Sequence, residues 1–173
     1  MNQSSFTLTV EEIRKEFDRA FIYPELNEKK EERDFLSIRI QKDLFAVPVM
    51  EIKGVQKCPR VTPVVSPNPA LLGIGMIQGN LIALYRLGAF VSVSDQPGSP
   101  VWVLLAGDGS IGFVFDELHG YLRIPADEMR AAKDASPSSF IVGAFEHSGD
   151  SHTVLNLPNL VQAVFSRKTI HVG

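Results

Sequence analysis

The sequence predicts a mainly β protein built from two small packed barrels, and an internal repeat is the main reason. The segment FAVPVMEIKGVQKCP, at 45–59, returns in outline as IGFVFDELHGYLRIP at 111–125, an offset of 66 residues. The repeat aligns Glu51 with Glu117, and the apolar positions around them match as well. A fixed period in a short chain suggests one β unit built twice. A chance match between two strand, glycine, strand, proline patterns is the alternative.

Composition indicates a globular intracellular protein. The chain has 173 residues, enough for one domain or for two small ones that need each other, and 45% of them are hydrophobic. Its one cysteine, Cys58, can form no internal disulfide and has no zinc-site spacing, which fits a reducing cytoplasm. The N-terminus lacks the order of a signal peptide, and no apolar run is long enough to cross a bilayer. We therefore expect a cytoplasmic protein without direct membrane insertion.

Charge divides the chain into an acidic extension and a neutral body. Residues 1–34 hold 6 basic and 9 acidic side chains, and residues 35–173 hold 11 of each, so the net charge of −3 lies in the extension. A body without a basic stripe argues against nucleic acid as a partner.

The extension, residues 1–33, is expected to be a helix followed by a charged linker. Thr9 and Glu12 have the spacing of a capping box, and Pro24 should end the helix. An isolated helix this short is marginal in water, so its apolar stripe should dock, either on the body of this chain or on a partner. The stripe consists of Val10, Ile13, Phe17, Ala20 and Phe21.

From Asp34 onward the pattern becomes β. Leu36, Ile38 and Ile40 alternate with polar residues and predict a strand, and a second strand is expected at 44–49. The proline-rich segment 58–70 is incompatible with a helix or a central strand. Two further strands are expected within 73–87, around a turn at Gly79-Asn80.

The second half follows the same plan after a loop at 92–100 that divides the two halves. The Asp108-Gly109 pair is a strong hairpin signal. The expected elements are a strand at 101–106, a strand at 111–115, a helical turn within 126–133, a hairpin from 140–146 and 152–156 around Ser148-Gly149-Asp150, and a closing helix at 157–165.

The glycine-rich segment 107–112, GDGSIG, matches the letters of a dinucleotide-binding fingerprint but not its context. That fingerprint requires a helix N-terminus to hold the pyrophosphate, whereas a strand is expected here. Asp108 also stands where the nucleophile elbow of a hydrolase requires its first glycine. The glycines therefore indicate a hairpin.

The remaining chemical candidates are weak. His147 and His152 flank one predicted turn and could meet across it, but no third metal ligand is placed nearby. Asp116 and Glu117 are adjacent on a predicted strand and point to opposite faces, so a surface charge and a turn-capping acceptor are their expected roles. The sequence predicts no catalytic residue, no metal site and no cofactor, and hence no enzyme.

Four segments in order resemble the CheW-like domain: 45–55, 73–87 (GIGMIQGNLIALYRL), 111–125 and 154–161 (VLNLPNLV). The resemblance extends from Asp34 to Phe165 and implies two five-stranded SH3-like β-barrels packed through a shared core. The CheW-like domain would then occupy 34–170 as two intertwined subdomains, with the N-terminal helix before it and a short C-terminal helix near its end.

The resemblance implies function by binding, as an adaptor that couples chemoreceptors to the histidine kinase CheA in a bacterial chemosensory pathway. In the family, one surface docks on the regulatory domain of the CheA-type kinase. A groove between the subdomains grips the cytoplasmic tip of a methyl-accepting chemoreceptor. The matching receptor-groove positions are Ile52, Gly54, Val55, Gly73, Met76, Gln78 and Gly79, and the kinase side is expected at an exposed strand edge formed by Phe45, Ala46, Val47 and Val49.

The chain departs from the family pattern at the receptor groove. Met76 to Gly79 stands where the family has N-L-R-G, so Gln78 replaces the usual arginine, and Gly54 stands where an acid is common. Arg86 likewise replaces the acid of the family's P-V-I-D-L. The acid and the arginine can pair across the groove, and losing both together can be nearly neutral. We therefore expect a retained fold with an altered receptor surface.

Three alternatives stay open. Gly54, Gly73 and Gly79 could simply permit tight turns, and Ile52 and Val55 could be core residues. The domain could be a specialised connector or insulator that has lost kinase or receptor binding. It could instead be a β-barrel enzyme or small-ligand binder that uses the cleft between the barrels, which convergent polar groups and a perturbed acid would favour.

Overall fold

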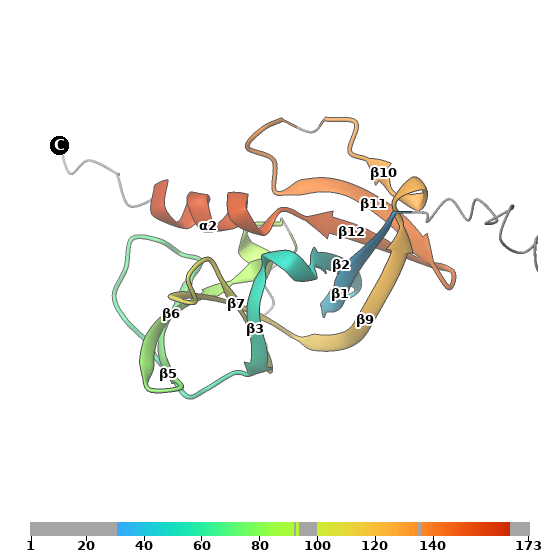
Figure 1. Cartoon of the computed structure of the whole chain (residues 1–173). Helices are drawn as coiled ribbons and strands as arrows, with labels where there is room; N and C mark the ends of the chain where they lie inside the picture. Colours follow the sequence, from blue (N-terminus) through green and yellow to red (C-terminus); the bar gives the residue numbers. More distant parts are fainter. Residues whose placement is uncertain (1–30, 92, 94–99, 135, 167–173) are drawn as a thin grey trace, which may run out of the picture. The chain divides into compact units, whose positions relative to one another are not determined.

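The computed structural model describes residues 31–91, 93, 100–134 and 136–166. The expected N-terminal helix, nearly all of the 1–33 extension and most of the loop at 92–100 lie outside the described residues. From Glu32 the chain forms one compact body, in which two sheets are followed by a short helix (Figure 1). The prediction of a mainly β fold is confirmed.

Sheet A contains six strands, one of which has only two residues. Its order is β10-β11-β12-β2-β1-β9. The strands are β1 (Glu32–Ile40), β2 (Asp43–Pro48), β9 (Glu117–Pro125), β10 (Arg130–Ala131), β11 (Ile141–His147) and β12 (Asp150–Leu155).

Sheet B has the same number of strands, and its order is β3-β7-β8-β6-β5-β4. The strands are β3 (Ile52–Lys57), β4 (Val61–Thr62), β5 (Leu71–Ile77), β6 (Asn80–Arg86), β7 (Trp102–Ala106) and β8 (Ile111–Phe115). The 3₁₀ turns η1 (Val49–Glu51), η2 (Leu87–Ala89) and η3 (Ala126–Glu128) connect strands. The helical turn expected within 126–133 is limited to η3, and β10 follows it.

The two halves of the chain exchange hairpins. Sheet A combines β1 and β2 with four strands of the second half, and sheet B combines β7 and β8 with four strands of the first half. The two sheets follow one plan. If six is added to the strand numbers of the first half and subtracted from β7 and β8, the order of sheet B becomes that of sheet A read from the other end. Parallel pairs, β12 with β2 and β6 with β8, join the exchanged hairpins to their new sheets. The predicted pair of packed β subdomains is therefore confirmed, and the matching strand orders agree with the predicted repeat.

Matching two-residue turns close the β5–β6 and β11–β12 hairpins. Gln78 and Gly79 have φ values of 48° and 81°, and Ser148 and Gly149 have φ values of 54° and 88°. Two successive left-handed residues form the turn type that suits the twist of a hairpin. The first turn is thus Gln78-Gly79 rather than the expected Gly79-Asn80, because Asn80 already pairs with Ile77.

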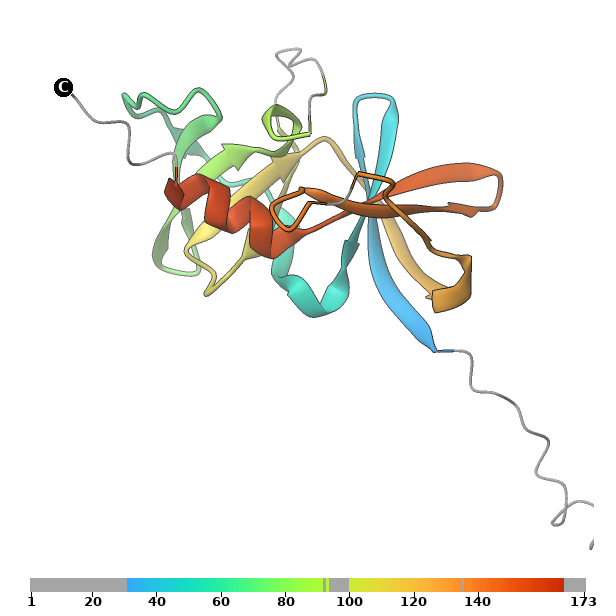
Figure 2. The same cartoon turned by 90° about the horizontal axis from the view of Figure 1, so that it is seen from above.

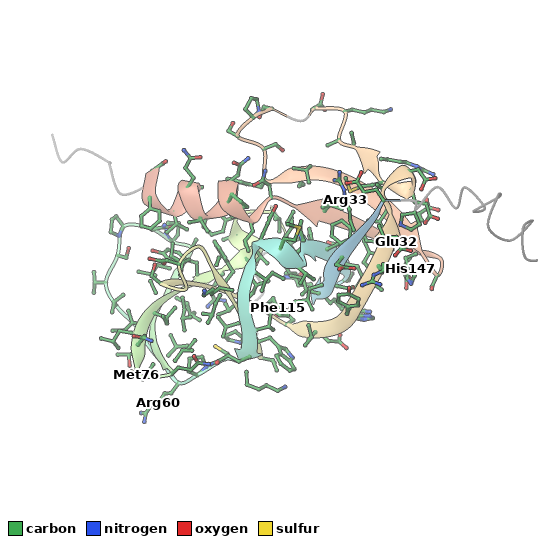
Figure 3. All side chains as sticks on the ribbon, in the orientation of Figure 1. Glu32, Arg33, Arg60, Met76, Phe115 and His147 are labelled. Atoms are coloured by element: carbon green, nitrogen blue, oxygen red, sulfur yellow. The ribbon has the colours of Figure 1, made fainter. Side chains whose placement is uncertain are left out.

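Three apolar clusters fill the body. Each sheet encloses a small core of its own, with Phe35 and Phe145 in sheet A and Ile77 and Leu84 in sheet B. Each sheet therefore forms a barrel, and we refer to the two as barrel A and barrel B. A larger core lies between the sheets, and Figure 3 shows one of its residues, Phe115, near the middle of the body. The hairpin strands β2 and β8 contribute side chains on both faces to these cores.

The predicted exposed strand edge at Phe45, Ala46 and Val47 is wrong. β2 lies between β12 and β1 in sheet A, so its backbone groups already have partners on both sides. The three side chains are at most 4% exposed. Only Val49, in η1, keeps an exposed side chain among the four residues of that prediction.

The closing helix α2 (Leu157–Ser166) confirms the helical spacing of its apolar residues. It follows β12 and extends along the side of sheet B in both views (Figure 1, Figure 2). Leu157, Leu160 and Val164 bury into the shared core. The Glu51 carboxylate accepts a hydrogen bond from the Leu157 N–H at 2.9 Å, and Asn156 Oδ1 accepts one from the Asn159 N–H at 2.9 Å. These acceptors satisfy N–H groups that have no partner inside the helix.

A buried histidine joins three strands inside barrel A. His152 on β12 is 4% exposed and stacks on Phe145 at a centroid distance of 5.1 Å. Its Nδ1 lies 3.3 Å from the Asp150 carbonyl oxygen, which only accepts, so Nδ1 carries the proton. Nε2 then accepts from the Ser37 hydroxyl at 3.1 Å. Burial lowers the pKa of His152, and the charges of His147 and His119 act in the same direction.

The lowered pKa predicts a loss of stability in mild acid. Below the ordinary histidine value near 6.5, the unfolded state takes up the proton more readily than the folded state does. The free energy of unfolding should therefore fall as the pH drops below about 6.5 and level off below the folded-state pKa. Urea denaturation between about pH 8 and about pH 5 measures this slope. The His152→Gln variant, which does not titrate, should show a smaller slope, and an unchanged slope would contradict the assignment.

Candidate functional site

A pocket opens at one end of barrel B, and we refer to it as the sheet B pocket. It has a volume of about 260 Å³. Strand β3 and two hairpin ends supply its walls. The lining residues are Lys53, Gly54, Val55 and Gln56 from β3, Ile77, Gln78, Asn80 and Ile82 from the β5–β6 hairpin, and Leu105, Asp108 and Gly109 from the β7–β8 hairpin.

The structure brings three of the predicted receptor-groove residues together in this pocket: Gly54, Val55 and Gln78. Ile52, at the start of β3, packs against the shared core instead. Met76 alternates with the inward-facing Ile77 and is 57% exposed on β5, where Figure 3 shows it far from Phe115.

Gly79 does not line the pocket. It occupies the second position of the β5–β6 turn, where its backbone is left-handed. Gly73 is buried in β5, and it too lies outside the lining. For both residues the structure favours the alternative interpretation, in which glycine is present because of the local backbone conformation and not because it contacts a partner.

Gly73 and Gly54, both in sheet B, differ in whether the fold requires a glycine. A Cβ on Gly73 would lie 2.3 Å from the Thr62 carbonyl oxygen, and the φ of 151° already disfavours a side chain. Gly54 has an ordinary backbone conformation, and a Cβ there would meet only Leu105 Cδ1, at a normal contact distance of 3.7 Å. The fold therefore needs glycine at position 73 but not at position 54, where the missing side chain enlarges the pocket.

Sequence reasoning missed Lys53, Gln56, Asn80 and Asp108. Asp108 and Lys53 come together because β7, from the second half, pairs with β3, from the first half. A β-bulge between Ile52 and Gly54 then leaves Lys53 without a cross-strand partner in that pairing. The sequence did signal that Asn80 and Asp108 lie at hairpin turns, but not that these two turns meet at one pocket.

Polar groups surround the pocket mouth, and several of them have no partner within the described part of the chain. Asp108 Oδ1 accepts a hydrogen bond from the Ser110 N–H at 2.9 Å, and bonding to Ser110 holds the pKa of this carboxyl below its usual value. Across residues 31–91 and the other described ranges, the side chains of Lys53, Gln56 and Gln78 make no hydrogen bond or ion pair. The pocket therefore presents a carboxylate, an ammonium and amides to solvent.

The equivalent end of barrel A is filled by its own side chains. Gly54 pairs with Leu105 in sheet B as Gly120 pairs with Ser37 in sheet A, so Ser37 occupies the place of Leu105. By the same logic, His152 takes the place of Ile82, and it bonds to Ser37.

A second polar contact lies at the same end of barrel A. His119, the counterpart of Lys53 in the repeat, accepts from the Arg39 guanidinium at 2.6 Å. Arg39 also pairs with Glu117 at 3.3 Å. Asp116 lies between β8 and β9 and not on a strand as predicted, and it accepts from the Gln41 N–H at 2.7 Å. Of the two roles predicted for Asp116 and Glu117, this bond corresponds to the turn-capping acceptor.

The described residues contain neither a metal-binding cluster nor a membrane-spanning helix. No group of three or more histidine, cysteine, aspartate or glutamate side chains is arranged there to hold a metal ion. Nor does this part of the chain contain a helix long and apolar enough to span a membrane. A larger hollow of about 410 Å³ lies beside α2 and is lined by residues of the helix, mostly apolar, with Glu51 and Gly107, and it contains none of the predicted site residues.

Two barrels that exchange hairpins and share a core define a double-barrel β domain. The chain belongs to the CheW-like domain family, whose model matches residues 34–165. The crystal structure of the scaffolding protein TtCheW from Thermoanaerobacter tengcongensis is similar, with a TM-score of 0.65 and 13% sequence identity. That similarity covers 72% of this chain and 89% of TtCheW. A sequence search of curated proteins finds no match.

The contrast between the two glycines gives a stability prediction. Gly73→Ala should lower the free energy of unfolding by more than about 2 kcal/mol, because the new methyl group would clash with the Thr62 backbone. Gly54→Ala should change it by less than about 1 kcal/mol, since the site has room and an ordinary backbone. Chemical denaturation of the two variants compares these effects directly. Equal losses would show that Gly54 is also a structural glycine.

Proposed function

We propose that this chain is a non-enzymatic adaptor that couples chemoreceptors to a CheA-type histidine kinase in a bacterial chemosensory pathway. Membership of the CheW-like family carries the proposal, because the family match spans the whole double barrel. The similarity to a solved scaffolding protein supports the same class of fold. Such a protein acts by holding partners together in the cytoplasm.

The sheet B pocket supports the receptor side of the proposal, although it lies within sheet B and not in a groove between the two subdomains. Gly54, Val55 and Gln78 were assigned to the receptor groove by resemblance, and they come from β3 and the end of the β5–β6 hairpin to line one pocket. The proposed partner is the cytoplasmic tip of a methyl-accepting chemoreceptor. Gly54 and Gln78 replace the charged pair common in the family, so the chain would recognise its own receptor without that pair.

The kinase side is proposed at the exposed end of the segment first considered for it. Val49 is 36% exposed and its neighbour Met50 is 97% exposed, both in η1 between the two sheets. An almost fully exposed methionine beside an exposed valine is an apolar contact that a partner can bury. The proposed partner here is the regulatory domain of the kinase.

An enzymatic role in the sheet B pocket is less well supported. Asp108 is the carboxylate in the lining, and its lowered pKa keeps it ionised at neutral pH. A general acid needs the opposite shift, toward the working pH. The polar groups of the pocket are therefore better suited to binding than to proton transfer.

Co-purification with the two partners tests the proposal. The tagged protein should retain both the regulatory domain of the kinase and the receptor-tip fragment from the same organism. The double variant Val49→Ser, Met50→Ser should lose the kinase domain at least about tenfold in affinity while keeping the receptor tip. Val64→Ser, Val65→Ser is a matched control, because those residues are 39% and 107% exposed elsewhere on the body.

Retention of neither partner by the unmodified chain would contradict the adaptor role. An equal loss of the kinase domain in both double variants would leave the adaptor role standing but remove the proposed kinase surface.

A further inference from the structure

The sheet B pocket carries a finer inference about what it binds. Lys53 and Asp108 both line it, and they bring one positive and one negative charge. Asp108 is engaged through Oδ1 with the Ser110 N–H, and Lys53 has no hydrogen-bond or ion-pair partner among the described residues. The amide side chains of Gln56 and Gln78 complete the polar rim, also without a partner in that part of the chain.

The Lys53, Gln56 and Gln78 side chains make no hydrogen bond or ion pair that holds the described part of the fold together, so they are available to a ligand. The corresponding end of barrel A shows what the fold does otherwise, since Ser37 and His152 bond to each other there and Arg39 bonds to His119. Barrel B instead has Leu105 and Ile82 at the places of Ser37 and His152. Around these apolar residues the Lys53, Gln56 and Gln78 side chains have no partner among the described residues.

Gly54 keeps the pocket open without a backbone reason for being glycine. A Cβ at this position would sit at an ordinary 3.7 Å from Leu105 Cδ1, so larger residues are compatible with the strand. Any side chain longer than alanine would extend into the space between Leu105 and the rim. Gly54 therefore determines which groups can enter.

We infer that the sheet B pocket receives an uncharged carboxamide side chain, asparagine or glutamine, from the partner. The inference takes its partner, the chemoreceptor tip, from the proposed function. A carboxamide has an acceptor oxygen for the Lys53 ammonium and donor hydrogens for the Asp108 carboxylate. A carboxylate would face Asp108 and an ammonium would face Lys53, so each charged group would meet a like charge. Gln56 and Gln78 can donate to or accept from the same amide.

Titration of the ¹⁵N-labelled full chain with three capped amino acids tests the pocket without any partner. N-acetylglutamine amide should shift the amide signals of Gly54, Leu105 and Asn80, whereas the matching glutamate and lysine derivatives should shift them less. Gly54→Leu should abolish the shifts while the rest of the spectrum stays folded. Charged derivatives that bind the unmodified chain as well as the glutamine derivative would overturn the inference.

Charge-neutralising variants sharpen the test. Lys53→Met should weaken binding of the glutamine derivative by about tenfold. The variant should then bind the lysine derivative more tightly than the glutamine derivative, because the negative charge of Asp108 is no longer balanced by Lys53. Asp108→Asn, which can still accept from the Ser110 N–H, should turn the preference toward the glutamate derivative. Lys57→Met is the matched control, since Lys57 lies 3.9 Å over the Trp102 ring, outside the pocket lining. Unchanged preferences in both pocket variants would also overturn the inference.

Binding of the receptor tip, measured for the unmodified chain and for Gly54→Leu, distinguishes this inference from the proposed function. Binding of the receptor tip to the unmodified chain and its loss in Gly54→Leu, with kinase binding retained, would support both. If the glutamine derivative binds the pocket and no receptor tip binds, the adaptor role falls and the pocket assignment stands. If the receptor tip binds Gly54→Leu as well as the unmodified chain, the pocket assignment falls and the adaptor role stands.

Discussion

The parallel pairing of exchanged hairpins is the constraint on which the rest of this structure depends. Strand β2 reaches β12 and strand β8 reaches β6, and each pairing places one half of the chain inside the sheet of the other half. Both strands are buried on two faces, so they fill a barrel and the shared core at once. Removing either hairpin would open one barrel and the core between the two. The body is therefore a single unit, although its sequence is a repeat.

The two barrels have the same strand order but differ at their open ends. Barrel A fills that end with a hydrogen-bonded serine and histidine and a bonded arginine, whereas barrel B has leucine and isoleucine there and a lysine and two glutamines without a partner among the described residues. A buried polar pair adds little stability compared with apolar residues of similar size. It does hold barrel A in one arrangement and closes that end. The two ends are equivalent in strand order, and the pocket at the end of barrel B is the one that we propose as a binding surface.

Much of the fold could be predicted from the sequence because its strands, turns and closing helix leave local patterns of apolar residues and glycines. The repeat, the alternation around Ile38, the glycine turns and the apolar spacing of α2 all survive in the structure. The hairpin exchange could not be predicted from these patterns, because strand pairing between halves depends on packing distant in sequence. For this reason Phe45 to Val47 was placed at an edge and is in fact central. The same limit hid Lys53 and Asp108, whereas Gly54 and Gln78 were found because they depart from a family pattern.

Native-state hydrogen exchange in increasing denaturant tests most directly whether the exchanged hairpins make the body one unit. Amides of Ala46 and Val154 in sheet A, and of Leu84 and Gly112 in sheet B, lie on the two parallel pairings. The account predicts that the most protected amides of both sheets exchange through one global opening, with the same free energy and the same denaturant dependence. Exchange of one sheet at a clearly lower free energy, while the other stays protected, would show two independent barrels and contradict it.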